Sequence, residues 1–254
     1  MSDVLSFHPS LRRHQIRFII ISTGLWNLDY ILANIESVNK QTVSDWLHLV
    51  VIDNKAEEEP LVKEHQNRKY YIRKDRHYDL ENTLWAIKEN EKEIHDDDVI
   101  CILNLDDTLL SHALESVKKI YEGNPQALLT YGSYVHLSGR PGRFAAPYRP
   151  WESVRLIPWK GSHCRTFKAK LWRAIPDEYL KDSTGRYFHT ASDLVTIWAM
   201  MELAGLERCI YNPEVVYVYN DQNPDSEHRV RAKEQRDAEV WIRRQQPLKR
   251  TRSL

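Results

Sequence analysis

The chain has 254 residues, of which 42% are hydrophobic, and its 36 basic residues are balanced by 36 acidic ones. The hydrophobic fraction suffices for a substantial core and excludes a largely disordered chain, while the balanced charge excludes a general nucleic-acid binder. The three scattered cysteines, Cys101, Cys164 and Cys209, exclude a disulfide framework and a zinc cluster, so we expect buried, reduced thiols. The longest aliphatic run near the N-terminus, residues 18–21, is too short to cross a membrane.

Two kinds of pattern alternate in the first half of the chain. Short apolar runs, typical of buried strands, alternate with segments whose apolar residues recur at helical spacing. We predict strands at residues 17–22, 46–53, 99–103 and 127–131. We predict helices at residues 28–38, 84–93 and 109–121. This βαβ alternation predicts an α/β fold, a Rossmann-like single domain with a mixed, mainly parallel central sheet flanked by helices.

The pattern changes after residue 136. Residues 137–163 combine prolines, glycines and tryptophans without periodicity, and a loop of this length in a compact chain is usually functional. Beyond it we predict a helix at 192–203, a strand at 214–219 and a charged helix at 226–245. Residues 229–254 carry nine basic and three acidic residues. Two interpretations stay open for this tail: a solvated helix with a frayed end, or a patch for phosphate or an anionic membrane surface.

Acidic residues follow two of the predicted strands. Asp53 ends the second strand, and the segment Asn104-Leu105-Asp106-Asp107 follows the third. Ligands of an open α/β sheet bind beyond the carboxyl ends of its strands, so we expect these side chains to face one crevice. Asp106 and Asp107 are oxygen donors of the kind that hold magnesium or manganese together with substrate phosphates. Purely structural roles are the alternative: Asp53 as a turn former or cap, and Asp107 as the cap of a helix beginning at Thr108.

The sequence Asn-Leu-Asp-Asp-Thr-Leu at residues 104–109 resembles the Asp-x-Asp-x-Thr signature of haloacid-dehalogenase-type phosphatases. In that family the nucleophilic aspartate would fall on Asn104, and an amide cannot form an aspartyl phosphate. The segment also follows two βα units, whereas the motif usually opens the fold. A phosphatase is therefore the less favoured alternative.

A second resemblance covers most of the chain. The blocks RFIIISTGLWN, ILANIESVNKQT and WLHLVVIDN, followed by Asn82, resemble the beginning of family-2 glycosyltransferases, and NLDDTL stands where Asp-x-Asp-Asp-x-Leu is common. SHCRTFKAKLWRAI, SDLVTIWAMMELAG and VVYVYNDQNPDSEH resemble acceptor-side blocks of a subgroup, in the right order. The resemblance implies a GT-A fold. It implies a donor half at 1–135, an acceptor and catalytic half at 136–225, and a basic C-terminal helix and tail at 226–254.

The resemblance also implies how the donor would be held. Asp53 would hydrogen-bond the nucleotide base, with Thr23 contributing, and Asn104 would stand where the family's first aspartate meets the ribose. A nucleotide sugar is the implied donor, with a weak preference for a UDP-sugar. Asn104 departs from the family's aspartate, which puts strict metal dependence in doubt.

Three residues are implied to bind a divalent cation, Mn²⁺ or Mg²⁺. Asp106 would be the chief ligand and would bridge to the donor diphosphate through the ion. Asp107 would assist, and His228 would complete the binding of metal or diphosphate. The alternative for His228 is a solvated surface histidine.

The resemblance makes Asp193 the catalytic base. Sugar transfer with inversion needs a carboxylate that takes the proton of the acceptor hydroxyl. Asp193 lies in the first turn of a predicted helix, where an acid simply suits the helix dipole, and that dipole would weaken it as a base. Trp159 and His163, in or beside the irregular loop, would shape the sugar or acceptor pocket, and Arg165 would belong to the same pocket and pair with a phosphate. Core packing is the alternative for the tryptophan, and a surface ion pair is the alternative for the arginine.

The expected activity is that of a single-addition, inverting, metal-dependent glycosyltransferase acting on a glycan, lipid-linked or protein acceptor. We expect a cytoplasmic protein, in a bacterium or a virus-infected host cell, without a transmembrane segment and with peripheral membrane contact through its basic tail. The main alternative is a catalytically silent nucleotide- or sugar-binding module on the same fold. Asn104 favours that alternative, whereas the retained Asp106 and Asp193 oppose it.

Overall fold

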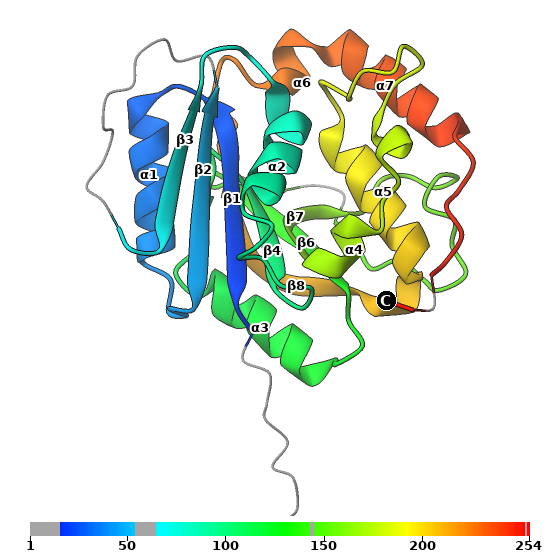
Figure 1. The fold of residues 1–254 in the computed structure, drawn as a ribbon, viewed down its shortest axis with the longest axis horizontal. Helices are drawn as coiled ribbons and strands as arrows, with labels where there is room; N and C mark the ends of the chain where they lie inside the picture. Colours follow the sequence, from blue (N-terminus) through cyan, green and yellow to red (C-terminus); the bar gives the residue numbers. More distant parts are fainter. Residues whose placement is uncertain (1–15, 54–64, 143–144, 252) are drawn as a thin grey trace, which may run out of the picture.

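The computed structural model describes residues 16–53, 65–142, 145–251 and 253–254 (Figure 1). Its centre is one eight-stranded sheet with the strand order β3-β2-β1-β4-β7-β6-β8-β5. The strands, in chain order, are β1 (Phe18–Leu25), β2 (Trp46–Asp53), β3 (Arg68–Arg73), β4 (Val99–Asn104), β5 (Thr108–Leu109), β6 (Leu129–His136), β7 (Ser162–Lys168) and β8 (Cys209–Tyr219).

The strand directions confirm the predicted mixed, mainly parallel sheet. The pairs β1–β2, β2–β3, β1–β4 and β6–β8 are parallel. The pairs β4–β7, β6–β7 and β5–β8 are antiparallel. The parallel strands β3, β2, β1 and β4 therefore end at one edge of the sheet, and that edge carries the acidic residues identified in the sequence.

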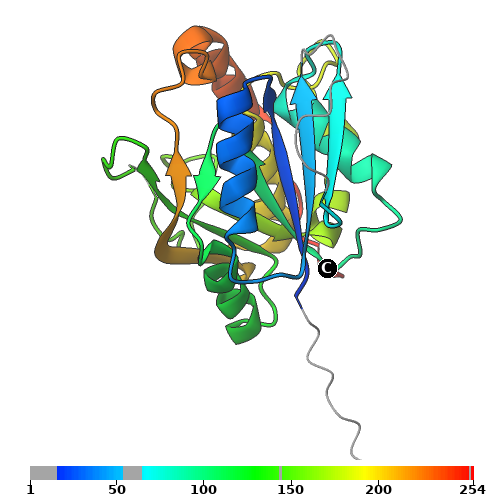
Figure 2. The ribbon, with the colours of Figure 1, turned by 90° about the vertical axis from the view of Figure 1, so that its left-hand side faces the viewer.

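Helices cover both faces of the sheet (Figures 1 and 2). The helices are α1 (Leu28–Asn39), α2 (Tyr78–Glu89), α3 (Ala113–Gly123), α4 (Ala169–Arg173), α5 (Ser192–Ala204), α6 (Glu227–Val230) and α7 (Ala232–Arg244), with 3₁₀ turns at Asp177–Leu180 and Leu206–Arg208. α1 and α3 lie on one face, and α2, α5 and α7 lie on the other.

The core follows the alternation of side chains along β1. Ile19 and Ile21 pack into the cluster that contains α5, whereas Phe18 and Ile20 pack into the cluster that contains α3. A strand that is buried on both faces reads as a continuous apolar run, which is why the sequence pattern predicts it well. α5 is apolar nearly all round and is buried along almost its whole length, so it anchors the C-terminal half to the sheet.

Several predicted bounds shift because tertiary pairing overrides the local pattern. The helix predicted at 84–93 begins earlier, at Tyr78, and ends at Glu89. The helix predicted at 109–121 begins at Ala113, because Leu109 pairs with Tyr217 across β5 and β8. The strands predicted at 127–131 and 214–219 are the longer β6 and β8, and the charged helix predicted at 226–245 is divided into α6 and α7.

Two strands of six or seven residues, β3 and β7, have no apolar run and were not predicted, and the two-residue β5 was not predicted either. β3 has the sequence RKYYIR and lies at the edge of the sheet, so only its inner residues need to be apolar. β7 has the sequence SHCRTFK and lies between β4 and β6, where its polar residues reach the functional edge. No helix in the described part of the chain is long and apolar enough to span a membrane.

Candidate active site

A cavity of about 440 Å³ lies beyond the carboxyl ends of β1, β2 and β4. The N-terminal turns of α2 and α5, the residues of β7 nearest that edge, and the segment that follows β8 complete its wall. Seven of the ten residues singled out in the sequence line it: Thr23, Asp53, Asn104, Asp106, His163, Arg165 and Asp193. Residues separated by as many as 170 positions in the chain therefore meet at one place.

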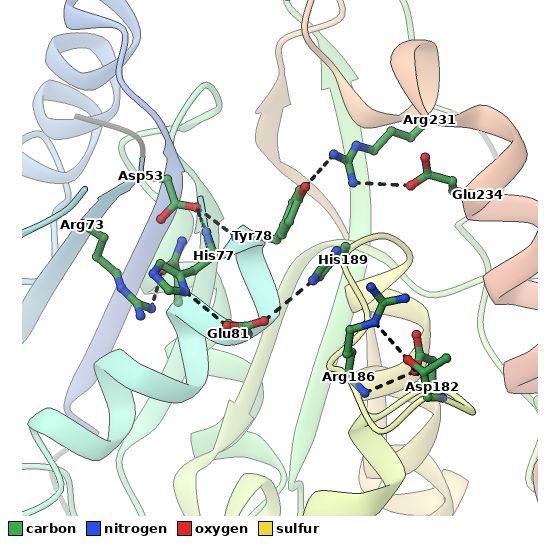
Figure 3. Close-up of polar contacts among 12 residues, drawn as sticks. Asp53, Arg73, His77, Tyr78, Glu81, Asp182, Arg186, His189, Arg231 and Glu234 are labelled. Atoms are coloured by element: carbon green, nitrogen blue, oxygen red, sulfur yellow. Dashed lines mark hydrogen bonds and ion pairs between the residues drawn. The ribbon is translucent and has the colours of Figure 1, made fainter. Parts of the chain in front are cut away.

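Backbone amides hold one oxygen of Asp53, and the other oxygen has no partner among the residues that the structure describes. Its Oδ2 accepts hydrogen bonds from the amides of His77 and Tyr78, each at 2.9 Å (Figure 3). These amides lie at the N-terminus of α2, where the first amides of a helix lack partners within the helix. The Oδ1 of Asp53 is buried and has no hydrogen-bond partner among the described residues. An unpaired buried acceptor is costly, so a ligand N–H at this position would be strongly favoured.

Asp106 and Asp107 differ in what surrounds them. Asp106 lines the cavity, and its Oδ2 accepts a hydrogen bond of 2.6 Å from Nδ2 of Asn223. Burial is the main cause that raises the pKa of the Asp106 carboxyl above its usual range. Asp107 does not line the cavity: it is buried and accepts hydrogen bonds from Tyr217 Oη at 2.6 Å and from the Asn220 amide at 2.7 Å.

The alternative of a helix cap at Asp107 is wrong. Residues 108–109 form β5, which pairs with β8, so no helix begins at Thr108. Asp107 instead joins β4 to the end of β8, and it also accepts a hydrogen bond of 3.2 Å from Nδ2 of Asn104. Burial, followed by the nearby charge of Asp106, raises the pKa of Asp107 well above its usual range. Asn104 therefore has its amide turned toward Asp107 while it also lines the cavity.

Asp79 is a cavity residue that sequence reasoning missed. Its Oδ1 accepts a hydrogen bond of 3.0 Å from Oγ1 of Thr23. Burial is the largest influence on its carboxyl, and the charges of Asp106 and Asp53 add to it, so the pKa of Asp79 is raised to about 6. β3 was not predicted, so no predicted strand end marked Asp79, and the helix was predicted to begin after it.

Asp193 and Arg165 form an ion pair inside the cavity. Asp193 lies in the first turn of α5, and its Oδ2 is 2.9 Å from Nη1 of Arg165 on β7. The Arg165 side chain is 6% exposed and the Asp193 side chain is 37% exposed, so the arginine belongs to the wall and the carboxylate remains open to a ligand. Nε of Arg165 is buried and has no hydrogen-bond partner within the described part of the chain.

His163 lies beside this pair. Its Nδ1 is 3.3 Å from Nη2 of Arg165, and its ring stacks on Tyr217 with 4.4 Å between the centroids. Burial, helped by the charge of Arg165, lowers the pKa of His163 well below its usual range. The imidazole is therefore neutral at pH 7 and supplies a hydrogen-bonding surface in place of a charge.

Trp159 and Asp107 were predicted as site residues but do not line the cavity. The ring of Trp159 packs against Trp198 of α5 with 5.9 Å between the centroids, next to the main core cluster. Asp107 lies behind the wall, as described above. The side chain of His228 is outside the described part of the structure, so its role stays a prediction. The sequence block that contains it nevertheless contributes Asn223, Asp225 and Ser226 to the cavity.

Among the carboxylates that line the cavity, Asp106 and Asp79 lie close enough for their charges to interact, and this pair could hold a divalent cation. Over the ranges that the structure describes, no group of three or more histidine, cysteine, aspartate or glutamate side chains is arranged around a metal position. Magnesium and manganese commonly use only one or two carboxylates and take their other ligands from substrate phosphates and water. The donor set therefore fits an ion that enters together with a phosphorylated ligand.

Solved glycosyltransferase structures share this fold. The S. aureus TarS fragment 1–349 is 13% identical, with a TM-score of 0.59 over 81% of this chain and 60% of that one. The same fragment in complex with UDP-GlcNAc is 14% identical, with a TM-score of 0.59 over 83% of this chain and 60% of that one. The mannosyltransferase PcManGT from Pyrobaculum calidifontis, in complex with GDP-Man and Mn²⁺, is 13% identical, with a TM-score of 0.53 over 84% of this chain and 59% of that one.

This chain thus has the α/β fold of these glycosyltransferases and spans about 60% of their length. No protein-family model and no curated protein matches its sequence. The likeness concerns the fold, and the residues in the cavity determine the chemistry.

Proposed function

We propose that this protein is a glycosyltransferase of family 2 that moves a sugar from a nucleoside-diphosphate sugar to an acceptor hydroxyl. One observation carries the proposal. Asp53 with its Oδ1 unpaired among the described residues, the carboxylate of Asp106, and the Asp193–Arg165 pair all line one cavity at the carboxyl edge of the sheet. In this proposal residues 1–135 form the donor half, residues 136–225 the acceptor half, and residues 226–254 the basic C-terminal helix and tail.

The free Oδ1 of Asp53 is the proposed contact for the nucleotide base. A carboxylate oxygen accepts hydrogen bonds and repels lone pairs. Uracil, thymine and guanine present a ring N–H, whereas cytosine and adenine present a ring-nitrogen lone pair at the matching position. We therefore favour a uridine, thymidine or guanosine diphosphate, with UDP first. Thr23 and Asn104 lie beside this contact in the same cavity.

The proposed cation is Mn²⁺ or Mg²⁺, with Asp106 as the chief ligand. When bound, such an ion neutralises the charge that develops on the leaving diphosphate. Asp107 already accepts hydrogen bonds on both of its oxygens, from Tyr217 and Asn104 on one and from Asn220 on the other, so its proposed assistance is to hold the turn that carries Asp106. His228 is kept as a further contact for metal or diphosphate.

Asp193 is the proposed base. As the acceptor oxygen bonds to the anomeric carbon, the bond from that carbon to the diphosphate oxygen breaks, and the acceptor proton passes to Asp193. Arg165 fixes the carboxylate in one orientation and leaves its outer side open to the acceptor. Attack from the face opposite the leaving group gives inversion. The acceptor is a glycan, lipid-linked or protein hydroxyl, and His163 forms part of the wall that it meets.

The basic tail supports a second, finer proposal, which is peripheral contact with an anionic membrane surface on the cytoplasmic side. Part of its charge is used inside the molecule, because Arg243 pairs with Glu239 and Arg250 pairs with Glu207. In the described part of the tail, the exposed basic residues without an ion pair are Arg229, Lys233, Arg236, Arg244 and Lys249. Co-sedimentation with phosphatidylglycerol vesicles tests this contact, and the absence of binding at low salt would contradict it.

Turnover tests the proposed function against the silent-module and phosphatase alternatives. The protein is incubated with UDP-GlcNAc or with GDP-Man in the presence of Mn²⁺, and release of the nucleoside diphosphate is measured. Release that is lost in Asp193→Asn supports the transferase. Binding without release supports a silent module, and hydrolysis of a simple phosphate ester that needs no nucleotide sugar supports the phosphatase.

A further inference from the structure

Tyr78, the first residue of α2, has a backbone conformation that non-glycine residues rarely adopt. Its φ is 60°, in the left-handed region. A bulky residue keeps such a conformation only where its surroundings over-determine it, and such positions cluster at functional sites. Tyr78 lines the cavity, and its amide is one of the two that hold Asp53. Its conformation therefore bears directly on the proposed base contact.

The ring of Tyr78 is clamped by two other segments of the chain (Figure 3). It stacks on the ring of His189, with 4.1 Å between the centroids and an interplanar angle of 19°. The guanidinium of Arg231 lies 4.5 Å from the ring centroid, and its Nη2 donates a hydrogen bond of 2.6 Å to Tyr78 Oη. Arg76, which precedes α2, lies 4.7 Å from the same centroid.

A carboxylate ties the histidine to the same helix turn. Glu81 lies one turn after His77, and its Oε2 is 3.3 Å from His77 Nδ1. Its Oε1 is 3.8 Å from His189 Nε2, so one side chain spans the gap between α2 and the loop that carries His189 (Figure 3). Burial is the main cause that lowers the pKa of His189, which keeps the stacked imidazole neutral at pH 7.

The clamp also reaches the proposed catalytic edge. His189 lies two residues before Ala191, which has a φ of 54° and immediately precedes α5 with its base Asp193. Arg231 immediately precedes α7 and follows Asn223, the partner of Asp106, by eight residues. The Tyr78 ring therefore joins the turn that holds Asp53 to the two segments that carry the rest of the site.

We propose that Tyr78 is a positioning residue: its ring, clamped between His189 and Arg231, holds the His77 and Tyr78 amides on Asp53 and so fixes the free Asp53 oxygen for base recognition. The inference rests on the proposed nucleotide-sugar function and adds a residue that acts through Asp53. Its consequence is that base selectivity depends on contacts made far along the chain, at residues 189 and 231.

Tyr78→Gly tests this inference because glycine adopts the left-handed region without strain. The variant keeps the backbone and loses the clamped ring. We measure dissociation constants for UDP against CDP and for GDP against ADP, and melting temperature in parallel. In Tyr78→Gly the dissociation constant of the better-bound diphosphate, UDP or GDP, is expected to rise about tenfold. The ratio of the CDP to the UDP constant, or of the ADP to the GDP constant, is then expected to approach one, while the melting temperature stays unchanged. Tyr78→Phe keeps the stacking and is expected to restore most of the selectivity.

Tyr187→Ala is the matched control. Tyr187 lies in the loop that carries His189, but its hydroxyl donates a hydrogen bond to Asp177, which does not line the cavity. The variant is expected to leave both dissociation constants unchanged. Wild-type affinity and selectivity in Tyr78→Gly would overturn the inference while leaving the proposed function intact. Wild-type protein that binds none of the four diphosphates overturns both. If Tyr78→Gly does not fold, His189→Ala and Arg231→Met decide: loss of base selectivity supports the clamp, and unchanged selectivity in both overturns it.

Discussion

The guanidinium of Arg165 holds the carboxylate of Asp193 at 2.9 Å between Nη1 and Oδ2, and the two residues come from a central strand and from the first turn of a buried helix. The Arg165 side chain is buried, whereas the Asp193 side chain is partly exposed to the cavity. A charge-assisted contact of this kind fixes direction as well as charge, so the open side of Asp193 points to one place in the cavity. Four predictions follow from this arrangement and from the carboxylates around it.

Arg165→Met is expected to lower the turnover number about a hundredfold, because Asp193 loses the partner that orients it. The dissociation constant for UDP is expected to change far less, since Asp53 is untouched. Donor turnover and UDP titration measure the two quantities. Arg173→Met is the matched control, because Arg173 pairs with Asp96 at the surface. Equal loss of activity in both variants would show that the effect is not specific to the pair.

Asp193→Asn is expected to abolish most of the transfer, by a factor of about 10² to 10⁴, because an amide cannot take the acceptor proton. The variant keeps the size of the side chain and one acceptor oxygen, so donor binding is expected to persist. Diphosphate release from UDP-GlcNAc or GDP-Man, compared with the wild type, is the measurement. A fully active variant would remove Asp193 from the role of base.

Asp106→Ala is expected to remove the part of diphosphate affinity that depends on Mn²⁺ and to leave the metal-free affinity nearly unchanged. The reason is that Asp106 is the cavity carboxylate proposed to share the ion with the donor phosphates. Titration of UDP with and without Mn²⁺ gives both values. Asp97→Asn, a surface carboxylate paired with Lys168 and Lys170, is the control. An unchanged manganese effect in Asp106→Ala would contradict the assignment.

Asp79→Asn is expected to stabilise the protein at pH 7. The pKa of Asp79 is raised to about 6 in the folded state, chiefly by burial, so the folded state binds its proton more tightly than the unfolded chain does. Stability from this group is present at acidic pH and is lost as pH rises from the unfolded value through about 6. The asparagine variant escapes that loss, which amounts to about 1–2 kcal/mol once the solvent open to this side chain is allowed for.

Denaturant unfolding at pH 4 and pH 7 checks this expectation. The stability gain of Asp79→Asn is expected at pH 7 and is expected to shrink toward zero near pH 4. Asp75→Asn, an exposed carboxylate just before α2, is expected to show no such trend. A gain of the same size at both pH values would rule out the titration of Asp79 as its origin.

The sequence predicted the parts of the fold that are set by local pattern. β1 and β2 are buried on both faces, so their apolar runs identify them; β1 carries the predicted cavity residue Thr23 near its end, and β2 ends at the predicted Asp53. β7 has no such run because it lies in an antiparallel part of the sheet and sends Arg165 and His163 into the cavity. The polar residues that β7 contributes to the site interrupt the apolar pattern by which the strand would otherwise be predicted.

The same limit applies to individual residues of the site. Trp159 lies in the irregular loop and Arg165 lies two residues beyond it. No local pattern shows that the Trp159 ring packs on Trp198 whereas Arg165 lines the cavity. Asp79 was missed because its role depends on Thr23, 56 positions away. Tyr78 could not be recognised at all, since its backbone conformation and its two clamping partners arise only from the tertiary structure.

Thermal-shift measurement of the wild-type protein with UDP, GDP, dTDP, ADP and CDP, each with and without Mn²⁺, shows whether the cavity binds a nucleoside diphosphate together with a divalent cation. A ligand that binds only the folded state raises the melting temperature. A donor site built on Asp53 and Asp106 predicts a rise with a diphosphate whose base carries a ring N–H, and a larger rise when Mn²⁺ is present. A melting temperature that none of the five diphosphates raises, with or without the metal, would contradict it.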